Sequence, residues 1–379
     1  MTNRKNLFTV TVLFAATLLS AQKPSLKDAY KNAFKIGVAL NSAQSFETDP
    51  VGDAIVKAQF NSISPENILK WELVHPQPDT YDFKASDAYV AFGEKNQMFT
   101  IGHNLVWHSQ VPNWVFEHPD GTFLTRKQLL KRMQEHIKTV VGRYKGRIKG
   151  WDVVNEALNE DGTLRQSLWY KIIGPDYLVE AFKAAHKADP QAELYYNDYS
   201  LENEAKRNGA IALLKKLKAA GCHITAIGTQ EHDNLEWPAT DQVDATITAF
   251  AALGVKVMVT ELDIDVLPPV VRNGSAEVGQ TSASQPDLNP YANGLPDAVQ
   301  QQLADRYANL FATFLKHKDV VTRITFWNVT DGDSWKNDWP VRGRKNYPLL
   351  FDREGQPKPA FDAVIKVAQE TAHSFDENK

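Results

Sequence analysis

Cysteine is nearly absent from this sequence, because Cys222 is the only one in 379 residues. A single cysteine cannot form an internal disulfide, and there is no CxxC pair or cluster of cysteine with histidine. A disulfide scaffold and a thiolate metal centre are therefore excluded, so stability must come from a packed core. We expect Cys222 itself to be a small buried residue just before a strand.

An excess of positive charge is also lacking. Lys and Arg number 42 against 46 Asp and Glu, which gives a formal net charge of −4. Such a balance does not suggest binding to nucleic acid or to an anionic membrane. The chain is 43% hydrophobic and 23% charged, which is ordinary for a globular protein. Since no coiled-coil pattern suggests self-association, we expect a monomer.

One uncharged apolar run stands at the N-terminus. The basic MTNRKN precedes LFTVTVLFAATLLS, and the polar AQKPS follows it. This is the order of a secretory signal peptide, and the run is short for a membrane span. We predict that residues 1–21 are a signal peptide cleaved near Ala21, so that the protein is secreted or periplasmic. An uncleaved N-terminal anchor is the alternative.

The rest of the chain, residues 22–379, alternates between short β-rich runs and amphipathic helical patterns. Eight strands alternating with helices indicate parallel βαβ units and an α/β fold. We predict a single closed (β/α)8 TIM barrel over 22–379. A doubly wound sheet is the alternative, but it favours a glycine-rich first turn, and GVALNSAQ is not GxGxxG. The runs expected as strands are 34–40, 60–64, 99–108, 148–156, 192–198, 224–232, 255–263 and 323–331.

Helix signals lie between these runs. Thr125 and Gln128 have the spacing of a capping box, and an apolar stripe at helical spacing follows them. Gly221 and Gly254 stand where a helix would end in a left-handed residue. The stripe consists of Leu129, Leu130, Met133, Ile137, Val140, Val141 and Tyr144.

Polar residues end almost every predicted strand. In a barrel, the carboxyl ends of the strands form the active-site face, so this polarity predicts a wet cleft there. A structural hydrogen-bond network that caps the barrel is the alternative for some of these residues. They are His103, Trp107, His108, Asn155, Glu156, Asn197, Asp198, Gln230, Glu231, His232, Glu261, Asp263, Trp327 and Asp331.

Two glutamates in this set are the candidate catalytic pair. Glu156 ends the fourth run and Glu261 lies near the end of the seventh, so their side chains are expected to face one another over a central cleft. Two carboxylates that flank a bond perform glycoside hydrolysis, one protonated and the other ionised. Mutual repulsion and unequal burial separate two such pKa values. Position in the barrel favours this interpretation over a structural role.

Three histidines offer a different constellation. His103, His108 and His232 are potential metal ligands, but their spacing does not match a metal-binding motif. Histidines hydrogen-bonded to carboxylates or to sugar hydroxyls explain the pattern better. We therefore expect no metal and no other cofactor.

Seven segments at and beside the predicted strands form a distinctive series. They are SPENILKWE (64–72), GHNLVWH (102–108), WDVVNEAL (151–158), YYNDYSLE (195–202), GTQEH (228–232), VTELDI (259–264) and FWNVTD (326–331). They resemble the motifs of glycoside hydrolase family 10, occur in that family's order and cover nearly all of the chain after the predicted signal peptide. The family consists mainly of endo-β-1,4-xylanases on a (β/α)8 barrel that retain the anomeric configuration.

The resemblance implies a role for each matching residue. Glu156 matches the general acid/base and Glu261 the nucleophile. Asn155 matches the residue that bonds the sugar 2-hydroxyl, His232 the residue that holds the nucleophile, and Gln230 a support beside it. The other implied substrate-binding residues are the polar set on the non-reducing side (Glu66, Asn67, Lys70), two residues that line the site at the cleaved sugar (His103, Trp107) and two aromatic walls (Trp327, Trp335).

Some segments depart from the family's commonest pattern. ENILK replaces ENEMK, and WNV replaces WGV, so Asn328 is expected to reshape the cleft beside Trp327. The Pro-, Ser-, Gly- and Asn-rich segment 267–296 is predicted to be a long loop that borders the reducing-end side of the cleft.

The predicted function is endo-hydrolysis of xylan and xylo-oligosaccharides. A retaining β-1,4-glucanase or mannanase is the near alternative, and xylose differs from glucose in lacking an exocyclic hydroxymethyl group. A non-catalytic carbohydrate-binding barrel is another, but such a protein would be expected to have lost a catalytic carboxylate. A metal-dependent hydrolase that uses the histidines is the third.

Overall fold

The computed structural model describes residues 24–270 and 286–376. Its strands all pair in parallel within one sheet. The strands are β1 (Lys35–Leu40), β2 (Ser62–Pro65), β3 (Phe99–Val106), β4 (Gly150–Asn155), β5 (Glu193–Asp198), β6 (Ala226–Thr229), β7 (His232–Asn234), β8 (Lys256–Asp265) and β9 (Val321–Phe326).

The sheet closes on itself, and the closure confirms the predicted barrel. Neighbouring strands follow the order β6-β5-β4-β3-β2-β1-β9-β8, and β6 also pairs with β8. Ile36 of β1 lies opposite Ile324 of β9, and Ile227 of β6 lies opposite Val257 of β8. The short β7 pairs only with the far end of β8, next to the barrel mouth. The doubly wound alternative is therefore wrong.

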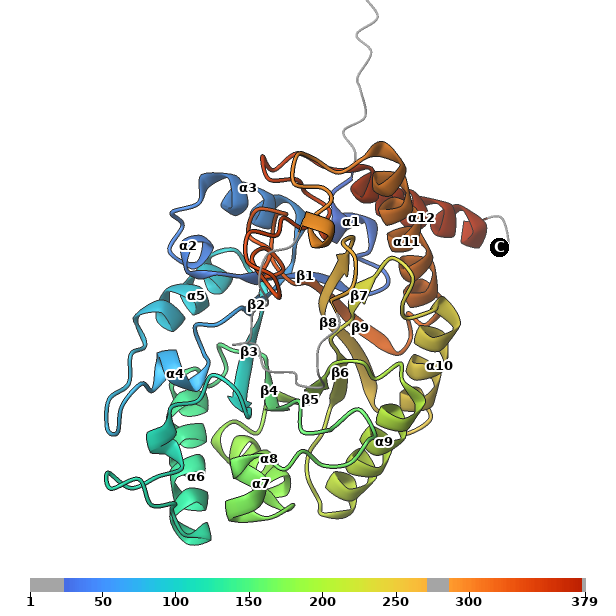
Figure 1. Ribbon diagram of the computed structural model, residues 1–379. Coiled ribbons are helices and arrows are strands. Elements are labelled where there is room, and N and C mark those ends of the chain that lie inside the picture. The colour runs from blue at the N-terminus through green and yellow to red at the C-terminus, as the bar shows by residue number, and fades with distance from the viewer. Residues whose placement is uncertain (1–23, 271–285, 377–379) are drawn as a thin grey trace, which may run out of the picture.

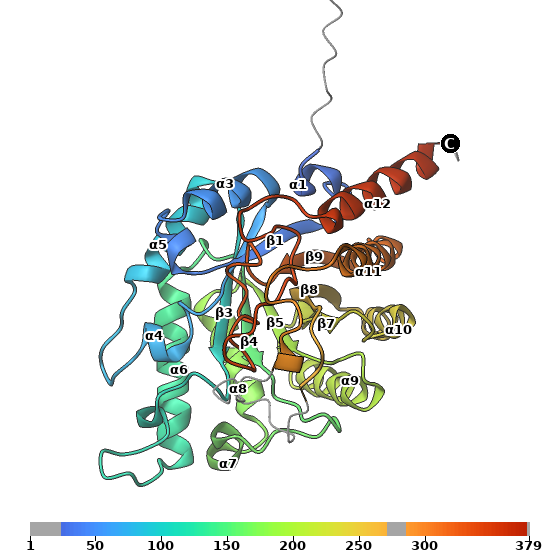
Figure 2. The same cartoon turned by 45° about the horizontal axis from the view of Figure 1, so that its top comes forward.

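Helices surround the closed sheet on its outer side (Figure 1), and the first and last helices lie side by side (Figure 2). The helices are α1 (Leu26–Ala29), α2 (Ser42–Ser45), α3 (Pro50–Gln59), α4 (Trp71–Val74), α5 (Lys84–Lys95), η1 (Asn113–Val115), α6 (Arg126–Arg143), α7 (Leu168–Ile173), α8 (Tyr177–Ala188), α9 (Glu204–Ala219), α10 (Thr240–Ala251), η2 (Pro286–Leu288), α11 (Asp297–Lys316) and α12 (Pro359–Asp376).

Helix α6 begins as the sequence predicts. The Thr125 side chain accepts a hydrogen bond from the Gln128 backbone N–H, and the Gln128 side chain accepts one from the Thr125 N–H. This capping box satisfies N–H groups that have no partner inside the helix. Every residue of the predicted stripe is buried except Leu130, which is half-buried. Gly221 and Gly254 both adopt a positive φ after their helices, as predicted.

The core has two parts. Apolar residues between the helices and the outside of the sheet form the larger part, and Cys222 is buried with them, as expected. A smaller cluster of Ile101, Tyr195, Ala226 and Met258 comes from four strands, β3, β5, β6 and β8. A barrel interior filled in this way is a packed core and not a pore. This packed interior supports the strand ends that carry the polar side chains of the mouth.

Two predicted strands differ from the observed ones. The run 224–232 is divided into β6 and β7, because Glu231 adopts a left-handed φ of 56° that a continuous strand cannot contain. The run 323–331 is a strand only as far as Phe326, and Asn328 shortly after has a φ of 98°. Both departures lie at the barrel mouth, just beyond the carboxyl ends of β6 and β9.

Two sequence predictions fall on parts of the chain that are only partly described. Residues 1–21 lie outside the described residues, so the signal peptide stays a prediction. Of the predicted loop 267–296, residues 267–270 and 286–296 are described, and Tyr347 donates to the carbonyl of Tyr291 at 2.7 Å. Within residues 24–270 and 286–376, the helices are all too short or too polar to cross a membrane.

Candidate active site

A cleft of about 960 Å3 opens at the carboxyl ends of the barrel strands. All twelve of the predicted catalytic and substrate-binding residues line it. They come from segments that are distant in the sequence and adjacent only in the closed barrel. They are Glu66, Asn67, Lys70, His103, Trp107, Asn155, Glu156, Gln230, His232, Glu261, Trp327 and Trp335.

Glu156 follows β4 directly and is 8% exposed. Its backbone has a φ of 54°, which turns the side chain from the strand into the cleft. Trp107 Nε1 donates to Oε2 of Glu156 at 2.9 Å. Gln230 Nε2 at 3.1 Å and Asn155 Nδ2 at 3.3 Å both donate to Oε1. These three donors are neutral, so they fix the carboxyl group without adding a cation to it.

Glu261 lies within β8 and is 5% exposed. Asn197 Nδ2 donates to its Oε1 at 2.7 Å, and His232 Nε2 lies 3.2 Å from its Oε2. Burial raises the pKa of this carboxyl, but the His232 hydrogen bond and the charges of His103 and His232 outweigh burial and lower the pKa below its usual value. Glu261 is therefore held in its ionised form.

His232 connects two carboxylates. Its Nδ1 lies 3.0 Å from Asp263 Oδ1, on the side away from Glu261. Burial lowers the pKa of the imidazole, but Asp263 and Glu261 together raise it to about 9. Lys336 Nζ lies 3.3 Å from the same Asp263 oxygen, so Asp263 has a second cationic partner. At neutral pH His232 is a cation that donates to both carboxylates.

Amide side chains join the two glutamates. Asn197 Nδ2 bonds Asn155 Oδ1 at 2.9 Å as well as Glu261, and Gln230 Nε2 lies 3.4 Å from the same Asn155 oxygen. Since β4 and β8 are separated by β5 and β6 in the barrel, these amides span the gap between the strands. Glu156 and Glu261 thus face a common space with their positions mutually fixed.

The polar set from the second strand forms one end of the cleft. Lys70 Nζ donates to Asn67 Oδ1 at 2.8 Å and to Gln110 Oε1 at 2.7 Å. Burial lowers the pKa of Lys70 although nearby carboxylates, first among them Glu261, oppose the shift. Burial likewise raises the pKa of Glu66. Clustered donors and acceptors of this kind suit a ligand that is rich in hydroxyl groups.

Tryptophans form the walls of the cleft. The rings of Trp335 and Trp339 lie 4.4 Å apart, and Trp335 Nε1 donates to Asp263 Oδ2 at 2.7 Å. Trp327 lies edge-on to His103 at 5.4 Å. The observed role of Asn328 differs from the predicted one. Its side-chain oxygen accepts a hydrogen bond from the Trp335 backbone N–H, so it holds the next wall instead of lining the cleft beside Trp327.

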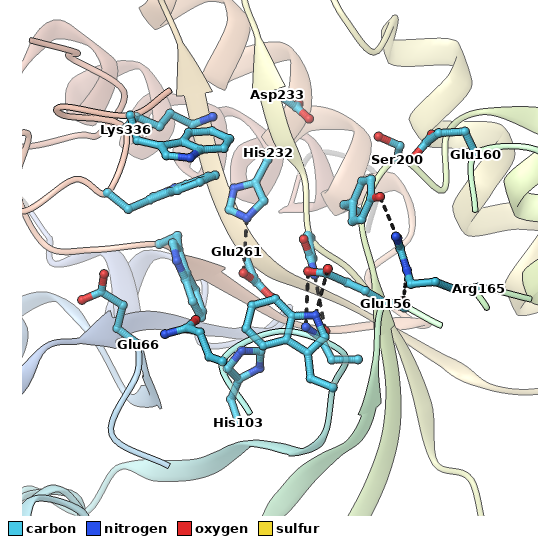
Figure 3. Close-up of a pocket in the computed structure, with 18 of the residues that line it drawn as sticks. Glu66, His103, Glu156, Glu160, Arg165, Ser200, His232, Asp233, Glu261 and Lys336 are labelled. Carbon is cyan, nitrogen blue, oxygen red and sulfur yellow. Dashed lines mark hydrogen bonds and ion pairs between the residues drawn. The ribbon is translucent and has the colours of Figure 1, made fainter. Parts of the chain in front are cut away.

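Sequence reasoning missed the other end of the cleft. Figure 3 shows Arg165, Glu160 and Ser200 on the opposite side of Glu156 and Glu261 from Glu66. These residues stand in loops beyond the strands, where no periodicity marks them. The only sequence feature that could have indicated them is their position a few residues after a predicted strand end. The missed lining residues are Gln110, Asn159, Glu160, Asp161, Arg165, Tyr199, Ser200, Glu202, Asp233, Trp237, Lys336 and Trp339.

Several polar strand-end residues support the site without lining it, as the structural alternative anticipated. Asp198 pairs with the buried Lys206 at 3.1 Å, and Asp331 pairs with Lys358 at 2.8 Å. Burial raises the pKa of Asp198 to about 6 against the opposing charge of Lys206. The strand-end residues outside the cleft lining are His108, Asn197, Asp198, Glu231, Asp263 and Asp331.

The histidines of the mouth are bonded to carboxylates. His103 Nδ1 lies 2.9 Å from Asp152 Oδ2, and His232 bonds Asp263 and Glu261. Within the described residues, no three His, Cys, Asp or Glu side chains are grouped as metal ligands. Hydrogen bonds from His103 and His232 to carboxylates are what the sequence pattern led us to expect of these two residues.

Two glutamates in unlike environments face a cleft that has polar side chains along its length and indole walls. On a (β/α)8 barrel, with the pair at the carboxyl ends of the strands, this site defines a glycoside hydrolase. The family model for glycosyl hydrolase family 10 matches residues 25–367, so the chain belongs to that family.

Relatives agree with this membership. The chain is 46% identical over 356 residues to an endo-1,4-beta-xylanase A of Xylanibacter ruminicola, a match that covers 94% of this chain and 96% of the relative. It is 42% identical to a beta-1,4-xylanase of Dictyoglomus thermophilum, over 90% of this chain and 91% of the relative. Among solved structures, an endoxylanase from a sugarcane soil metagenome superimposes with a TM-score of 0.87 at 45% identity, covering 90% of this chain and all of the other.

Proposed function

We propose that the protein is an endo-1,4-β-xylanase that hydrolyses xylan with retention, with Glu156 as general acid/base and Glu261 as nucleophile. The observation that carries the proposal is the contrast between the two carboxyls. Glu261 is held ionised by cationic His232, whereas Glu156 is held by the neutral donors Trp107, Gln230 and Asn155. A double displacement needs an ionised carboxylate as nucleophile, and Glu261 is the carboxyl that this site holds ionised.

In the first step, a Glu261 oxygen attacks the anomeric carbon of the bound sugar. The bond from that carbon to the glycosidic oxygen breaks, and Glu156 gives its proton to the departing oxygen. The product is a glycosyl ester on Glu261. In the second step, Glu156 takes a proton from water, the water oxygen bonds to the anomeric carbon, and Glu261 leaves as a carboxylate. Two inversions at one carbon retain the β configuration.

The assignment of xylan as substrate rests on the relatives, which are named xylanases, and on the shape of the cleft. Trp335 is held by Asp263, by the ring of Trp339 and by Asn328, so this wall cannot move aside easily. We expect this fixed indole wall to exclude the exocyclic hydroxymethyl group that glucose has and xylose lacks. Steric exclusion of one such group is worth about 10- to 200-fold in selectivity.

Proton NMR of xylo-oligosaccharide mixed with the purified protein tests function and mechanism together. We expect rapid cleavage in which the β-anomer appears first and then mutarotates. First appearance of the α-anomer would overturn the role of Glu261. An absence of cleavage, with cleavage of β-glucan or mannan instead, would overturn the choice of substrate.

Replacing the nucleophile supplies a control for the same experiment. Glu261→Gln preserves the shape of the side chain and the acceptor for Asn197 but cannot attack carbon. We expect turnover to fall by roughly 10^4-fold or more, while the protein stays folded and still binds xylo-oligosaccharide. Turnover close to that of the wild type would contradict the assignment.

We also infer that residues 1–21 direct export and are removed. The basic, apolar and polar order of this segment supports the inference. N-terminal sequencing of the protein recovered outside the cytoplasm of an expressing bacterium should begin near Ala21. An intact N-terminus on exported protein would instead support an anchor.

A further inference from the structure

Glu156 stands at a strained point of the backbone. Its φ of 54° is in the left-handed region, which costs a residue with a side chain free energy unless its surroundings hold it there. The side chain and the peptide that follows share one Cα, so any rotation of this backbone moves the carboxyl. The groups that hold the peptides after Glu156 therefore determine where its proton is delivered.

The N–H groups of this turn are held from one side by the end of β5. The Glu156 N–H donates to the Asn197 carbonyl at 2.9 Å, and the Ala157 N–H donates to Tyr196 Oη at 3.1 Å. The Leu158 N–H lies 3.4 Å from Asp198 Oδ2. Three successive donors are thus bound by three successive residues of the neighbouring strand.

The carbonyl groups of the same three residues are held by a single residue, Arg165. Its Nε donates to the carbonyl of Glu156 at 3.0 Å, its backbone N–H to that of Ala157 at 2.7 Å, and its Nη2 to that of Leu158 at 3.2 Å. Arg165 reaches them because the chain turns back at Gly162 and forms a bridge between Leu158 and Leu164. A planar guanidinium with fixed donor directions can hold two carbonyls at once, which an ammonium group cannot do with the same geometry.

Arg165 also extends the clamp to the cleft wall. Its Nη2 donates to Tyr199 Oη at 3.0 Å, and both residues line the cleft. The Tyr199 ring is fixed in turn by the buried Lys206, whose Nζ lies 3.3 Å from the ring centroid. This wall lies on the far side of Glu156 and Glu261 from Glu66 (Figure 3). If the polar set at Glu66 binds the non-reducing side, Tyr199 faces the leaving group.

We propose that Arg165 is a positioning residue for proton transfer by Glu156, and that it couples the acid/base to the wall that contacts the leaving group. The proposal rests on the proposed function, in which Glu156 protonates the departing oxygen. A displacement of about 1 Å from the productive geometry lowers a catalysed rate by about 10²-fold. The clamp prevents such displacement at the one carboxyl that must reach the glycosidic oxygen.

Two aryl β-xylobiosides test the proposal, because they differ in their need for an acid. The phenyl leaving group needs a proton, whereas 2,4-dinitrophenolate leaves without one. We expect Arg165→Lys to lower kcat/KM for the phenyl substrate by about 10²-fold and to change kcat/KM for the dinitrophenyl substrate by less than about threefold. Because the second step needs Glu156 as base, kcat of the variant on the dinitrophenyl substrate should still fall. Azide, which attacks the glycosyl ester without a base, should restore it.

Arg132→Lys is the matched control. Arg132 on α6 also donates to two backbone carbonyls, those of Trp114 and Val115, but it does not line the cleft. Its loss should leave the ratio between the two substrates unchanged. Equal losses on both substrates in Arg165→Lys, or no loss on either, would overturn the proposal.

A second variant covers the case in which Arg165→Lys does not fold. Tyr199→Phe keeps the ring and removes only the hydroxyl that Arg165 binds, so it should lower the phenyl rate selectively by a smaller factor. A Tyr199→Phe enzyme with an unchanged ratio would overturn the coupling. Failure of the proposed function is recognised separately, because the wild type would then cleave neither xylobioside.

Discussion

At the scale of single residues, His232 makes the active site sensitive to alkali. Its pKa is raised to about 9 by Asp263 and Glu261, against burial, and its usual value is 6.5. The cation is therefore favoured in the folded state. Its contribution to the free energy of unfolding is complete below pH 6.5 and disappears as the pH rises to about 9. Deprotonation of His232 removes its two ion pairs, at 3.0 Å to Asp263 and at 3.2 Å to Glu261.

We therefore predict that the free energy of unfolding of the wild type falls between pH 6.5 and 9. The His232→Asn variant should not show this fall. We expect the wild type to lose on the order of 1 to 3 kcal/mol across this range. Urea unfolding at several pH values measures it, with the variant as the comparison. The same slope in both proteins would show that a different group titrates.

Residues at or just after strand ends could be predicted to lie near the cleft, whereas many lining residues in the longer loops were missed. Position alone placed Glu156 and Glu261 at the mouth, because a barrel brings strand ends together at one face. Buried residues that bond these glutamates, such as Asn197, were recognised only as polar residues at strand ends. Arg165 was missed, since its function comes from carbonyls at 156–158 that a hairpin brings within reach. Nothing in its local sequence distinguishes it from a surface arginine.

At the scale of elements, the hairpin that carries Arg165 depends on Gly162. This residue has a φ of 80°, and a Cβ there would lie 2.3 Å from the carbonyl oxygen of Ala205 and against Gly209. We expect Gly162→Ala to destabilise the protein by about 2 to 4 kcal/mol from the left-handed backbone and the clash together. The displaced hairpin should also lower kcat on xylo-oligosaccharide. Urea unfolding and steady-state kinetics measure the two effects.

Gly121→Ala is the control for that prediction. Gly121 has a φ of 81°, but a Cβ there meets nothing within 4 Å. It should cost only the left-handed term, about 1 to 2 kcal/mol, without an effect on kcat. Equal losses of stability in the two variants would mean that the hairpin accommodates the methyl group.

The observed elements follow the predicted ones closely, and the exceptions have a local cause. The run 224–232 is predicted as one strand because Ile224, Ala226 and Ile227 begin it and its polar residues come at its end. The break comes from Glu231, whose carboxyl is buried beside the carboxyls of Glu202 and Asp233 and does not itself line the cleft. Burial and these neighbouring carboxyls raise the pKa of Glu231 well above its usual value. A carboxyl buried beside other carboxyls is a tertiary arrangement, and hydrophobic periodicity carries no information on it.

At the scale of the whole molecule, the barrel interior supports the mouth mechanically but takes no part in the chemistry. Met258 is 1% exposed and packs with Ile101, Tyr195 and Ala226 inside the barrel. We expect Met258→Ala to cost about 2 to 5 kcal/mol, the usual effect of removing a large core side chain. kcat at temperatures well below the new thermal midpoint should stay within about twofold of the wild type, since Glu261 lies three residues further along β8. A large loss of kcat at these temperatures would mean that β8 shifts when the Met258 side chain is removed.

The number of strands and their alternation with helices predicted the closed barrel, but not how the barrel closes. Each βαβ unit is local, and its hydrophobic pattern can be read directly. The pairing of β1 with β9 joins residues that no local pattern relates, because nearly the whole chain separates the two strands. It follows only from the requirement that eight twisted parallel strands leave no free edge.

Closure of the sheet between β1 and β9 ties the fold to the order in which the chain is made. β1 ends at Leu40 and its partner β9 ends at Phe326, close to the C-terminus. Until the ribosome has added Phe326, the N-terminal strand presents an unpaired edge on which another nascent chain can add. A truncated message that stops within α11 should thus give an aggregating product and not a weakened enzyme. The molecule is complete only when its last strand meets its first.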